Sequence, residues 1–442
     1  MLRVGGRWMA LSIMAAASFA ASSAAAAAGQ THWVTSWAAS AQGPYPVGNP
    51  SAPPDLSLVF PSAETGARDQ SLRLVVKPGF WGAKARMRFS NALGTQPVTF
   101  DGAFVGLQWS GSAVMPGSNR TITFGGSNSV TIAPGESVWS DAVALPFVKA
   151  GNELRGRKLA VSFHVVGSSG PMTWHAKALQ SSYATLPGAG SKGDDVSEAA
   201  FPFATASWFF LDALDMAAPK GLAAVVAFGD SITDGTASTM NGDDRWPDVL
   251  ARRLDGRWVV VNAGIGGNQV VGPKEYSPRK PFPGGPSALQ RIDRDVLTLS
   301  GVKAVIWLEG TNDFSRNGNA DADAVIAGMR EGVARIRAAI PGVKVIGATV
   351  TSALGSSSPA HGFELQDEKR RKLNDFIRGS GVFDGVADFD RVTTDPQTGG
   401  MKAEFVPDNT VGGPGDKLHP NRIGYQAMAA AIDLAMFGVG GK

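Results

Sequence analysis

Cysteine is absent from this chain of 442 residues. The absence excludes disulfides, thiolate nucleophiles and cysteine-ligated metal sites. Because no covalent cross-link is available, burial of apolar side chains has to stabilise the folded state. Hydrophobic residue types make up 43% of the chain and charged residues 18%. These fractions are typical of a globular protein and exclude an intrinsically disordered one.

Long apolar runs are missing as well, once the first 28 residues are set aside. In that stretch Arg3 and Arg7 precede an apolar run over residues 8–21, and alanine-rich sequence continues to Ala28. This order is typical of a secretory signal peptide with a small-residue cleavage site. The run is shorter than the ~20 apolar residues of a transmembrane helix. We therefore expect residues 1–28 to direct export, to the periplasm or out of the cell, and we expect no stable membrane anchor.

An excess of one charge is the third absence. Without Arg3 and Arg7 the chain has 39 basic and 38 acidic residues, so the sequence pI near 9.0 comes partly from the predicted leader. A balanced chain has no electrostatic reason to bind nucleic acid or an anionic membrane surface. We expect neither as a partner.

The length exceeds what one hydrophobic core usually serves, so we expect two domains. Residues 29–215 break into short runs of β-branched and aromatic residues, separated by glycine, proline, asparagine and aspartate. The runs cover residues 71–76, 85–89, 121–124, 129–132 and 158–166. This spacing predicts an antiparallel, sandwich-like all-β domain. Residues 216–221, with Pro219 and Gly221, are the expected linker.

Over residues 222–442, apolar strands alternate with amphipathic helices. Such alternation predicts a parallel sheet covered by helices on both faces, which is a three-layer α/β/α domain. Ligands of such sheets bind beyond the carboxyl ends of the strands. Strands are expected at 222–228, 258–261, 303–308, 344–350 and 386–389, and helices at 245–254, 288–297, 321–340, 364–378 and about 421–436.

Three short segments with catalytic residue types fall at that edge. Gly229-Asp230-Ser231 follows the first strand, Gly310-Thr311-Asn312-Asp313 follows the third, and Asp416-Lys417-Leu418-His419-Pro420 precedes the last helix. Together they contain every part that acyl transfer through a serine requires, which is a nucleophile, a base, an acid that orients the base, and donors for the oxyanion.

The roles follow from the residue types. Ser231 can attack, and His419 can take its proton. Asp416 can hold the imidazole, because an aspartate three residues before the histidine lets one loop present both groups. The Asn312 amide can face the developing negative charge. Asp416 and His419 as metal ligands are a weaker alternative, since that segment has no further histidine or acid beside them.

A fourth segment, residues 262–269, follows the second strand at the same edge and is rich in glycine. Glycine lets a backbone N–H approach a ligand without a side chain in the way. With the Ser231 N–H and the Asn312 amide, the Gly267 N–H would complete a three-donor oxyanion hole. Gly266 is the competing choice.

These four segments, in this order and at these spacings, resemble the SGNH (GDSL-like) hydrolase family of esterases and lipases over roughly residues 223–438. More narrowly, the chain resembles the branch of esterase domains associated with xylan degradation. Members of that branch often have an N-terminal β-domain that opens with two tryptophans four apart, here Trp33 and Trp37. Ile232 stands where the motif that named the family has leucine, and Thr311 where the branch often has an apolar residue. The stretches that carry the narrower resemblance are 264–268, 285–288, 308–310, 388–390 and 418–421.

The resemblance implies a flavodoxin-like hydrolase domain with carboxylic ester hydrolase activity. Ser231 is similar to the family's nucleophile, Gly267 and Asn312 to its oxyanion donors, and Asp416 and His419 to the remaining pair. Neither a metal nor a cofactor is implied. The preferred substrates are short acyl esters of carbohydrate, such as acetyl esters, as small molecules or in polysaccharide. The alternatives are a lipase or lysophospholipase acting on longer acyl chains and, in another class, a carbohydrate-binding surface protein with a vestigial hydrolase domain.

The same residues also have structural interpretations. A serine in a Gly-Asp-Ser turn is more often an N-cap than a nucleophile, and Asn312 with Asp313 could form a simple turn. Asp230 is expected to brace the first turn through backbone hydrogen bonds. Only His419 has an aspartate three residues before it and a proline after it. The other four histidines, His32, His164, His175 and His361, are therefore expected to be ordinary satisfied or solvated side chains.

Two irregular loops, residues 271–285 and 391–415, are expected to shape specificity, since long connections near an active edge usually bind substrate or act as lids. Tyr276 and Trp246 could contact a sugar or acyl group, although Trp246 falls in a helical pattern and is expected in the core. Trp33 and Trp37 are expected to anchor the N-terminal segment, because aromatic burial stabilises cores and interfaces strongly.

Overall fold

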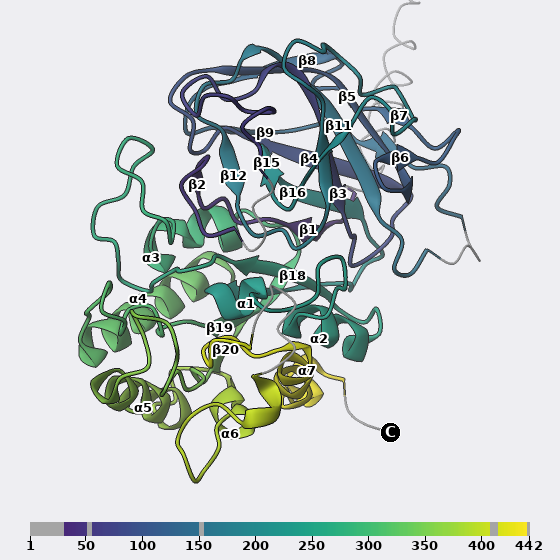
Figure 1. The fold of residues 1–442 in the computed structure, drawn as a ribbon. Coiled ribbons are helices and arrows are strands. Elements are labelled where there is room, and N and C mark those ends of the chain that lie inside the picture. Colours follow the sequence, from purple (N-terminus) through teal and green to yellow (C-terminus); the bar gives the residue numbers. More distant parts are fainter. Residues whose placement is uncertain (1–30, 51–54, 150–153, 407–413, 440–442) are drawn as a thin grey trace, which may run out of the picture. The chain divides into compact units, whose positions relative to one another are not determined.

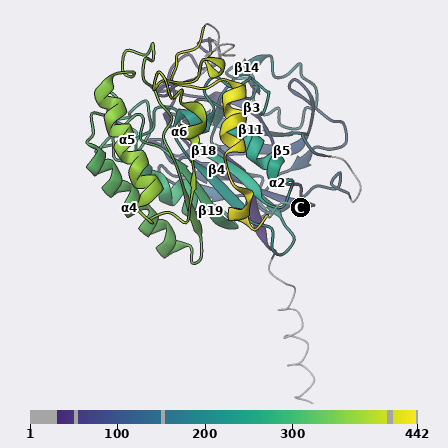
Figure 2. The same ribbon diagram turned by 90° about the horizontal axis from the view of Figure 1, so that it is seen from below.

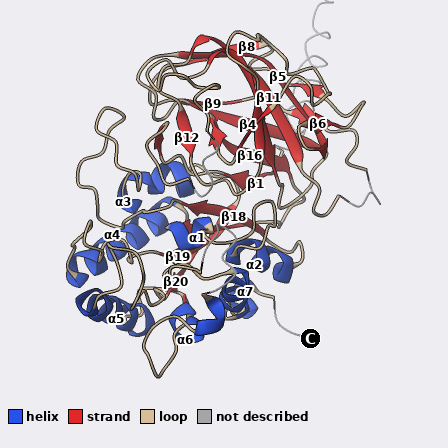
Figure 3. Ribbon diagram, in the orientation of Figure 1, coloured by secondary structure: helices blue, strands red, loops and turns tan. Residues whose placement is uncertain are grey.

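Antiparallel strands occupy the first half of the chain in the computed structural model (Figures 1 and 3), which describes residues 31–50, 55–149, 154–406 and 414–439. The predicted signal peptide lies outside the described residues. One sheet has the order β1-β16-β4-β10 with β9 beside β4, and a second has the order β14-β13-β3-β11-β5-β6 with β7 and β8 on β5. A small third sheet has the order β15-β12-β2. The bounds are β1 Trp33–Ala38, β2 Gly43–Pro44, β3 Arg68–Val76, β4 Lys84–Ser90, β5 Val98–Ser110, β6 Ala113–Val114, β7 Arg120–Thr121, β8 Ser129–Ile132, β9 Ser137–Trp139, β10 Val143–Ala144, β11 Leu159–Ser168, β12 Thr173–His175, β13 Ser182–Ala184, β14 Phe203–Thr205, β15 Trp208–Phe209 and β16 Leu211–Ala217.

The two larger sheets share one apolar core. Leu74 of β3 and Phe89 of β4 are fully buried in it. The rings of Phe89 on β4 and Phe163 on β11 meet edge to face with centroids 5.2 Å apart. Residues 70–76 of β3 and 159–165 of β11 are all buried, so these strands are covered on both faces, in keeping with the runs of β-branched and aromatic residues that predict them. The strand expected at 121–124 is wrong at its end, because β7 stops at Thr121 and Phe124 forms only an isolated bridge with Ser127.

The chain passes directly from the antiparallel strands into the second half. Residues 216 and 217, expected in a linker, instead complete β16, which pairs with both β1 and β4. Val34 and Ala38 of β1 belong to the same apolar cluster as the parallel sheet described next. From residue 33 onward, the described residues accordingly form one compact unit.

The second half contains a five-stranded parallel sheet in the order β18-β17-β19-β20-β21, as the alternation of strands and helices predicts. Counted along the chain this order is 2-1-3-4-5, the order of doubly wound flavodoxin-like sheets, whose ligands bind where the order reverses beside the first strand. The bounds are β17 Ala224–Gly229, β18 Val259–Gly264, β19 Val302–Leu308, β20 Lys344–Ala348 and β21 Gly385–Ala387.

Helices cover both faces of this sheet (Figures 1 and 2). On one face, α4 (Ala322–Ala339) and α5 (Glu364–Gly379) bury apolar side chains against Val226 and Trp307. On the other face, α2 (Trp246–Leu254) and α7 (Arg422–Ala430) pack on Val225 and Ile306. Trp246 is fully buried, which confirms its expected place in the core. The short helix α3 (Ala288–Ile292) joins the first face.

Three predicted boundaries are wrong. The helix expected over 288–297 changes to a π-helical turn at Asp293. The strand expected at 386–389 ends at Ala387, because the Asp388 side chain caps α6 (Phe389–Thr393). The helix expected to reach residue 436 ends at Ala430. Within the described residues no helix is both long and apolar enough to cross a bilayer.

Candidate active site

Ser231 lies at the point where β17 gives way to the short helix α1 (Ser231–Asp234). The preceding residue caps this helix, since Asp230 Oδ1 accepts the Ile232 N–H at 2.9 Å. The Ser231 hydroxyl is therefore not the N-cap that the structural interpretation proposed. As the first helical residue, Ser231 also has a backbone N–H with no partner within the helix.

Ser231, His419 and Asp416 form one chain of hydrogen bonds. The Ser231 hydroxyl lies 2.8 Å from His419 Nε2, and His419 Nδ1 lies 2.6 Å from Asp416 Oδ2. Burial would raise the pKa of Asp416, but the hydrogen bond from the His419 ring, the His419 charge and two backbone N–H donors outweigh it and hold the pKa well below its usual range. An ionised Asp416 keeps the imidazole proton on Nδ1, which leaves Nε2 free to accept the serine proton.

The loop that follows β20 stabilises the backbone beside this pair. The Ser356 hydroxyl and the Ser357 N–H both donate to the Asp416 carbonyl, at 2.7 and 3.1 Å. His361 lies in the same loop, and its Nδ1 accepts a hydrogen bond of 2.7 Å from the side-chain amide of Gln366 in α5. Burial, together with the neighbouring His419, lowers the pKa of His361 to about 4. His361 is thus neutral at physiological pH and has a specific partner, as expected for an ordinary satisfied histidine.

The glycine-rich loop after β18 lies against α1. A Cβ on Gly264 would lie 2.2 Å from the Asp234 backbone nitrogen, so only glycine permits this approach. The Gly266 N–H donates to Asp234 Oδ2 at 3.1 Å, whereas the Gly267 N–H has no hydrogen-bond partner among the described residues. Gly267 has a φ of +83°, which glycine adopts without strain. Of the two candidate glycines, Gly267 alone therefore has a backbone donor left for a ligand.

Asn312 follows β19 and reaches the same loop. One N–H of its side-chain amide donates to the Asn268 carbonyl at 2.9 Å, and no partner for the other N–H occurs among the described residues. Residues 311–314 form a turn, as the structural interpretation predicts, and the Asp313 carboxylate accepts the backbone N–H groups of Val270 and Val271 at 2.8 and 3.0 Å. These contacts hold Asn312 beside Gly267 with one donor unused.

Arg291, which sequence reasoning did not single out, ties the ends of two strands to this loop. Its guanidinium donates to the carbonyls of Gly229 and Ala263, each at 2.8 Å, and to Asn268 Oδ1 at 2.7 Å. The group is fully buried and lies 4.0 Å from the Phe228 ring centroid. An arginine in an amphipathic helix gives no sequence signal for such a role, because the pattern is equally typical of a solvated helix face.

A comparison with models of protein families agrees with this geometry. Residues 227–427 match the GDSL-like Lipase/Acylhydrolase family. The second half of the chain therefore contains a domain of the SGNH, or GDSL-like, hydrolase family. It is a carboxylic ester hydrolase. The matched segment contains the Ser231, Gly267, Asn312, Asp416 and His419 segments of this esterase.

Solved structures similar to the esterase cover about half of it. A carbohydrate acetylesterase family member from Sinorhizobium meliloti is 17% identical, with 49% of this chain and 100% of the other covered and a TM-score of 0.38. The aryl esterase of M. smegmatis is 19% identical, with 47% and 95% covered and a TM-score of 0.36. A GDSL-like lipase from Bacteroides thetaiotaomicron is 20% identical, with 49% and 88% covered and a TM-score of 0.35. None of the curated proteins matches the sequence.

The two loops that are expected to shape specificity make different contacts. In residues 271–285 of the esterase, the Tyr276 hydroxyl donates to the Gln42 carbonyl at 3.0 Å, and burial raises the pKa of Tyr276 to about 12. Tyr276 is thus engaged by the N-terminal segment. Of residues 391–415, 407–413 lie outside the described residues, and the Glu404 carbonyl accepts a hydrogen bond from the Asn421 side chain at the start of α7.

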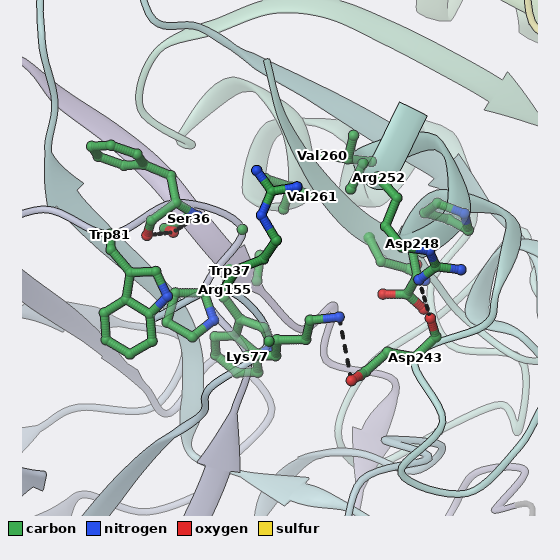
Figure 4. A pocket seen from close by; sticks show the side chains of 18 of the residues that line it. Ser36, Trp37, Lys77, Trp81, Arg155, Asp243, Asp248, Arg252, Val260 and Val261 are labelled. Carbon is green, nitrogen blue, oxygen red and sulfur yellow. Dashed lines mark hydrogen bonds and ion pairs between the residues drawn. The ribbon is translucent and has the colours of Figure 1, made fainter. Parts of the chain in front are cut away.

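A cavity of about 580 Å³ in the esterase is lined by residues of both halves of the chain (Figure 4). Its lining includes Trp37, Trp81 and Lys77 from the N-terminal half and Asp243 and Arg252 from the second half, but not Ser231, Asp416 or His419. The ammonium of Lys77 pairs with Asp243 at 3.3 Å across it. Ser231, Asp416 and His419 thus do not line the cavity, although Asp234 at the end of α1 does.

Proposed function

We propose that this esterase cleaves its substrate through an acyl-enzyme on Ser231. The observation that carries the proposal is the unbroken hydrogen-bonded chain from Ser231 through His419 to Asp416. His419 Nε2 takes the hydroxyl proton as Ser231 Oγ attacks the ester carbonyl, and Asp416 stabilises the imidazolium that forms. His419 then protonates the leaving alkoxide. Water, activated by the same histidine, releases the carboxylic acid in the second half of the reaction.

The oxyanion is proposed to bind three donors, which are the backbone N–H groups of Ser231 and Gly267 and the free amide N–H of Asn312. These donors belong to three different loops that meet at one edge of the sheet. Fixed donors stabilise charge that develops only in the transition state and need no reorganisation when it appears. The chemistry needs no metal or cofactor for any of these steps.

For the substrate we propose short acyl esters of carbohydrate, with acetyl esters preferred. Polar side chains lie on the segments around the catalytic chain: Asn49 binds the loop of Gly267, and Lys177 and His361 are close enough to Asp416 to interact with its charge. Such surroundings favour a hydroxyl-rich alcohol over a long acyl chain, which would need apolar surface to bury. We also propose that the protein is exported by its first 28 residues, which N-terminal sequencing of protein from the culture supernatant and from a periplasmic extract would test.

The decisive experiment measures nitrophenol release from acyl esters of increasing length. Rapid release from acetyl and butyryl esters, abolished by a serine-directed organophosphate, is the expected result. Acetylated xylan, pectin and phospholipid should then be compared for released acid. A preference for phospholipid or long acyl esters would replace the carbohydrate proposal by a lipase. Binding of polysaccharide with no release of acid from any ester would favour a carbohydrate-binding protein instead.

A further inference from the structure

Two side chains of the N-terminal segment bind the loop that contains the free backbone donor. Gln42 Nε2 donates to the Gly266 carbonyl at 2.8 Å, and Asn49 Nδ2 donates to the same carbonyl at 2.9 Å. Both residues are more than 200 positions away from Gly266 in the chain. Gln42 is fully buried and Asn49 half-buried. Neither belongs to a motif that sequence analysis singled out.

The Gly266 carbonyl belongs to the same peptide unit as the Gly267 N–H. In a planar trans peptide these two groups point in opposite directions, so the orientation of one sets that of the other. Hydrogen bonds to the carbonyl also polarise the unit and make its N–H a better donor. Gln42 and Asn49 thus act on the proposed oxyanion donor from the far end of its own peptide.

The preceding peptide and both glycines are held as well. Asp234 accepts the Gly266 N–H, and His175 Nε2 lies 3.2 Å from the second Asp234 oxygen. Burial would lower the pKa of His175, but the neighbouring Asp234 raises it above its ordinary value. The stem of Lys177 covers the Gly266 Cα, since a Cβ there would lie 3.2 Å from Lys177 Cε. The amide of Asn49 covers Gly267 in the same way, at 2.7 Å from the position of a Cβ.

We propose that Gln42 and Asn49 are positioning residues for the esterase reaction, which orient and polarise the Gly266–Gly267 peptide as an oxyanion donor. The inference rests on the proposed function, in which Gly267 supplies that donor. The N-terminal half is then part of the catalytic apparatus rather than an attached module. Because the two amides bind one carbonyl, each can hold the peptide when the other is lost.

This redundancy gives the inference a specific kinetic signature. Gln42→Met and Asn49→Leu keep the side-chain size and remove the donors. Each single substitution should lower kcat by no more than about threefold, and the double variant by roughly a hundredfold, which is more than the product of the two single losses. KM should change by less than about twofold, because the donor acts on charge that is present only in the transition state.

A phenylboronic acid provides a second readout, since its tetrahedral adduct with a serine places a negative oxygen in the oxyanion hole. Its inhibition constant should rise in step with the fall in kcat/KM across the three variants. Gln180→Met is the matched control. Gln180 is a buried glutamine of the N-terminal half whose side-chain amide donates to Asn241 Oδ1 at 2.7 Å and does not bind the loop of Gly266. This variant should keep kcat, KM and boronate inhibition within about twofold of the parent.

Two results would overturn the inference. One is a double variant that keeps its kcat and its boronate inhibition. The other is a Gln180→Met variant that loses as much activity as the double variant, which would indicate general loosening of the fold. A Ser231→Ala variant measured in parallel separates these failures from that of the proposed function. If Ser231→Ala kept its activity, the acyl-enzyme itself would be wrong, whatever Gln42 and Asn49 do.

Discussion

Asp416 binds His419 through both of its carboxylate oxygens. Oδ2 lies 2.6 Å from the ring Nδ1, and Oδ1 accepts the His419 backbone N–H at 2.8 Å. The spacing of three residues makes this double contact possible within one turn of the chain. It fixes both the ring and the backbone that carries it, so Nε2 has a defined position opposite Ser231.

The first prediction concerns the catalytic chain as a unit. Ser231→Ala and His419→Ala should each lower kcat by several orders of magnitude with little change in melting temperature. The double variant should be scarcely worse than either, because members of one catalytic unit fail together. Steady-state kinetics on a short nitrophenyl ester would check this. Losses that multiplied would mean that the two residues do not act as nucleophile and base.

The second prediction concerns the Asn312 amide. Asn312→Ala should lower kcat by roughly a hundredfold to a thousandfold while KM hardly changes, because the lost donor serves the transition state. Ser315→Ala is a suitable control, since it removes the hydrogen bond of 2.7 Å from the Ser315 hydroxyl to the Asn312 carbonyl and leaves the amide in place. Equal losses in both variants would assign Asn312 to the turn alone.

The third prediction separates the two glycines of the loop. Gly267→Ala combines a positive φ with a Cβ only 2.7 Å from Asn49 Nδ2, so it should displace the loop and reduce kcat by about a hundredfold or more. Gly266→Ala meets mainly the flexible end of Lys177, at 3.2 Å, and should cost much less. Kinetics of the two variants side by side would decide the matter. The reverse order would make Gly266 the important residue.

The fourth prediction concerns stability against pH. Because the pKa of His361 is about 4 in the folded protein and 6.5 ordinarily, the folded state binds fewer protons than the unfolded state between these values. Protonation of His361 therefore lowers the free energy of unfolding as the pH falls from 6.5 to 4, by roughly 3 kcal/mol in total. Urea unfolding of the parent and of His361→Gln checks this. The free energy of unfolding of the parent should fall relative to that of the variant as the pH is lowered from 6.5 to 4.

The comparison has to be a difference because other groups titrate nearby. Burial raises the pKa of Asp313 to about 7. Ionisation of Asp313 therefore lowers the free energy of unfolding as the pH rises from 3.8 to 7, whereas His361 lowers it as the pH falls. The pKa of Asp416 is lowered, so its protonation lowers the free energy of unfolding only as the pH falls below the ordinary pKa of 3.8. A difference between the two proteins that did not vary from pH 6.5 to 4 would contradict the His361 prediction.

The fifth prediction concerns the N-terminal half. Trp37 is buried in the antiparallel core and meets Trp208 edge to face at 4.9 Å, as its expected anchoring role requires. Val34 and Ala38 are buried with the parallel sheet, and the Thr35 N–H donates to the Ser300 carbonyl at 3.0 Å. A chain of residues 219–442 alone would expose this surface and should be poorly soluble and nearly inactive. Size-exclusion chromatography and ester kinetics would check this, and a soluble, fully active monomer would contradict it.

The sequence predicts most helices and strands well where a regular hydrophobic pattern ends at clear turn residues. The errors fall where a local side chain outweighed this pattern. The last helix ends early because the Asp433 side chain accepts the Ala435 N–H and starts a separate turn. The predicted linker is partly a strand because β1 and β4 pair with it on both sides, and pairing of Met216 with residues as distant as Val34 and Ala85 leaves no local signal.

The chemistry of the site was determined by the sequence itself. Ser231, His419 and Asp416 lie in short segments whose residue types and spacing suffice to predict a nucleophile, a base and an acid, because one turn or one loop presents each. The tertiary structure alone decided what surrounds them. Gln42, Asn49, Lys177 and Arg291 reach the site from distant segments, and their side chains have no neighbours in the sequence that indicate a role. Only folding places two amides of the N-terminal half on the carbonyl of Gly266, since hydrogen bonds between segments depend on distance in space and not on distance along the chain.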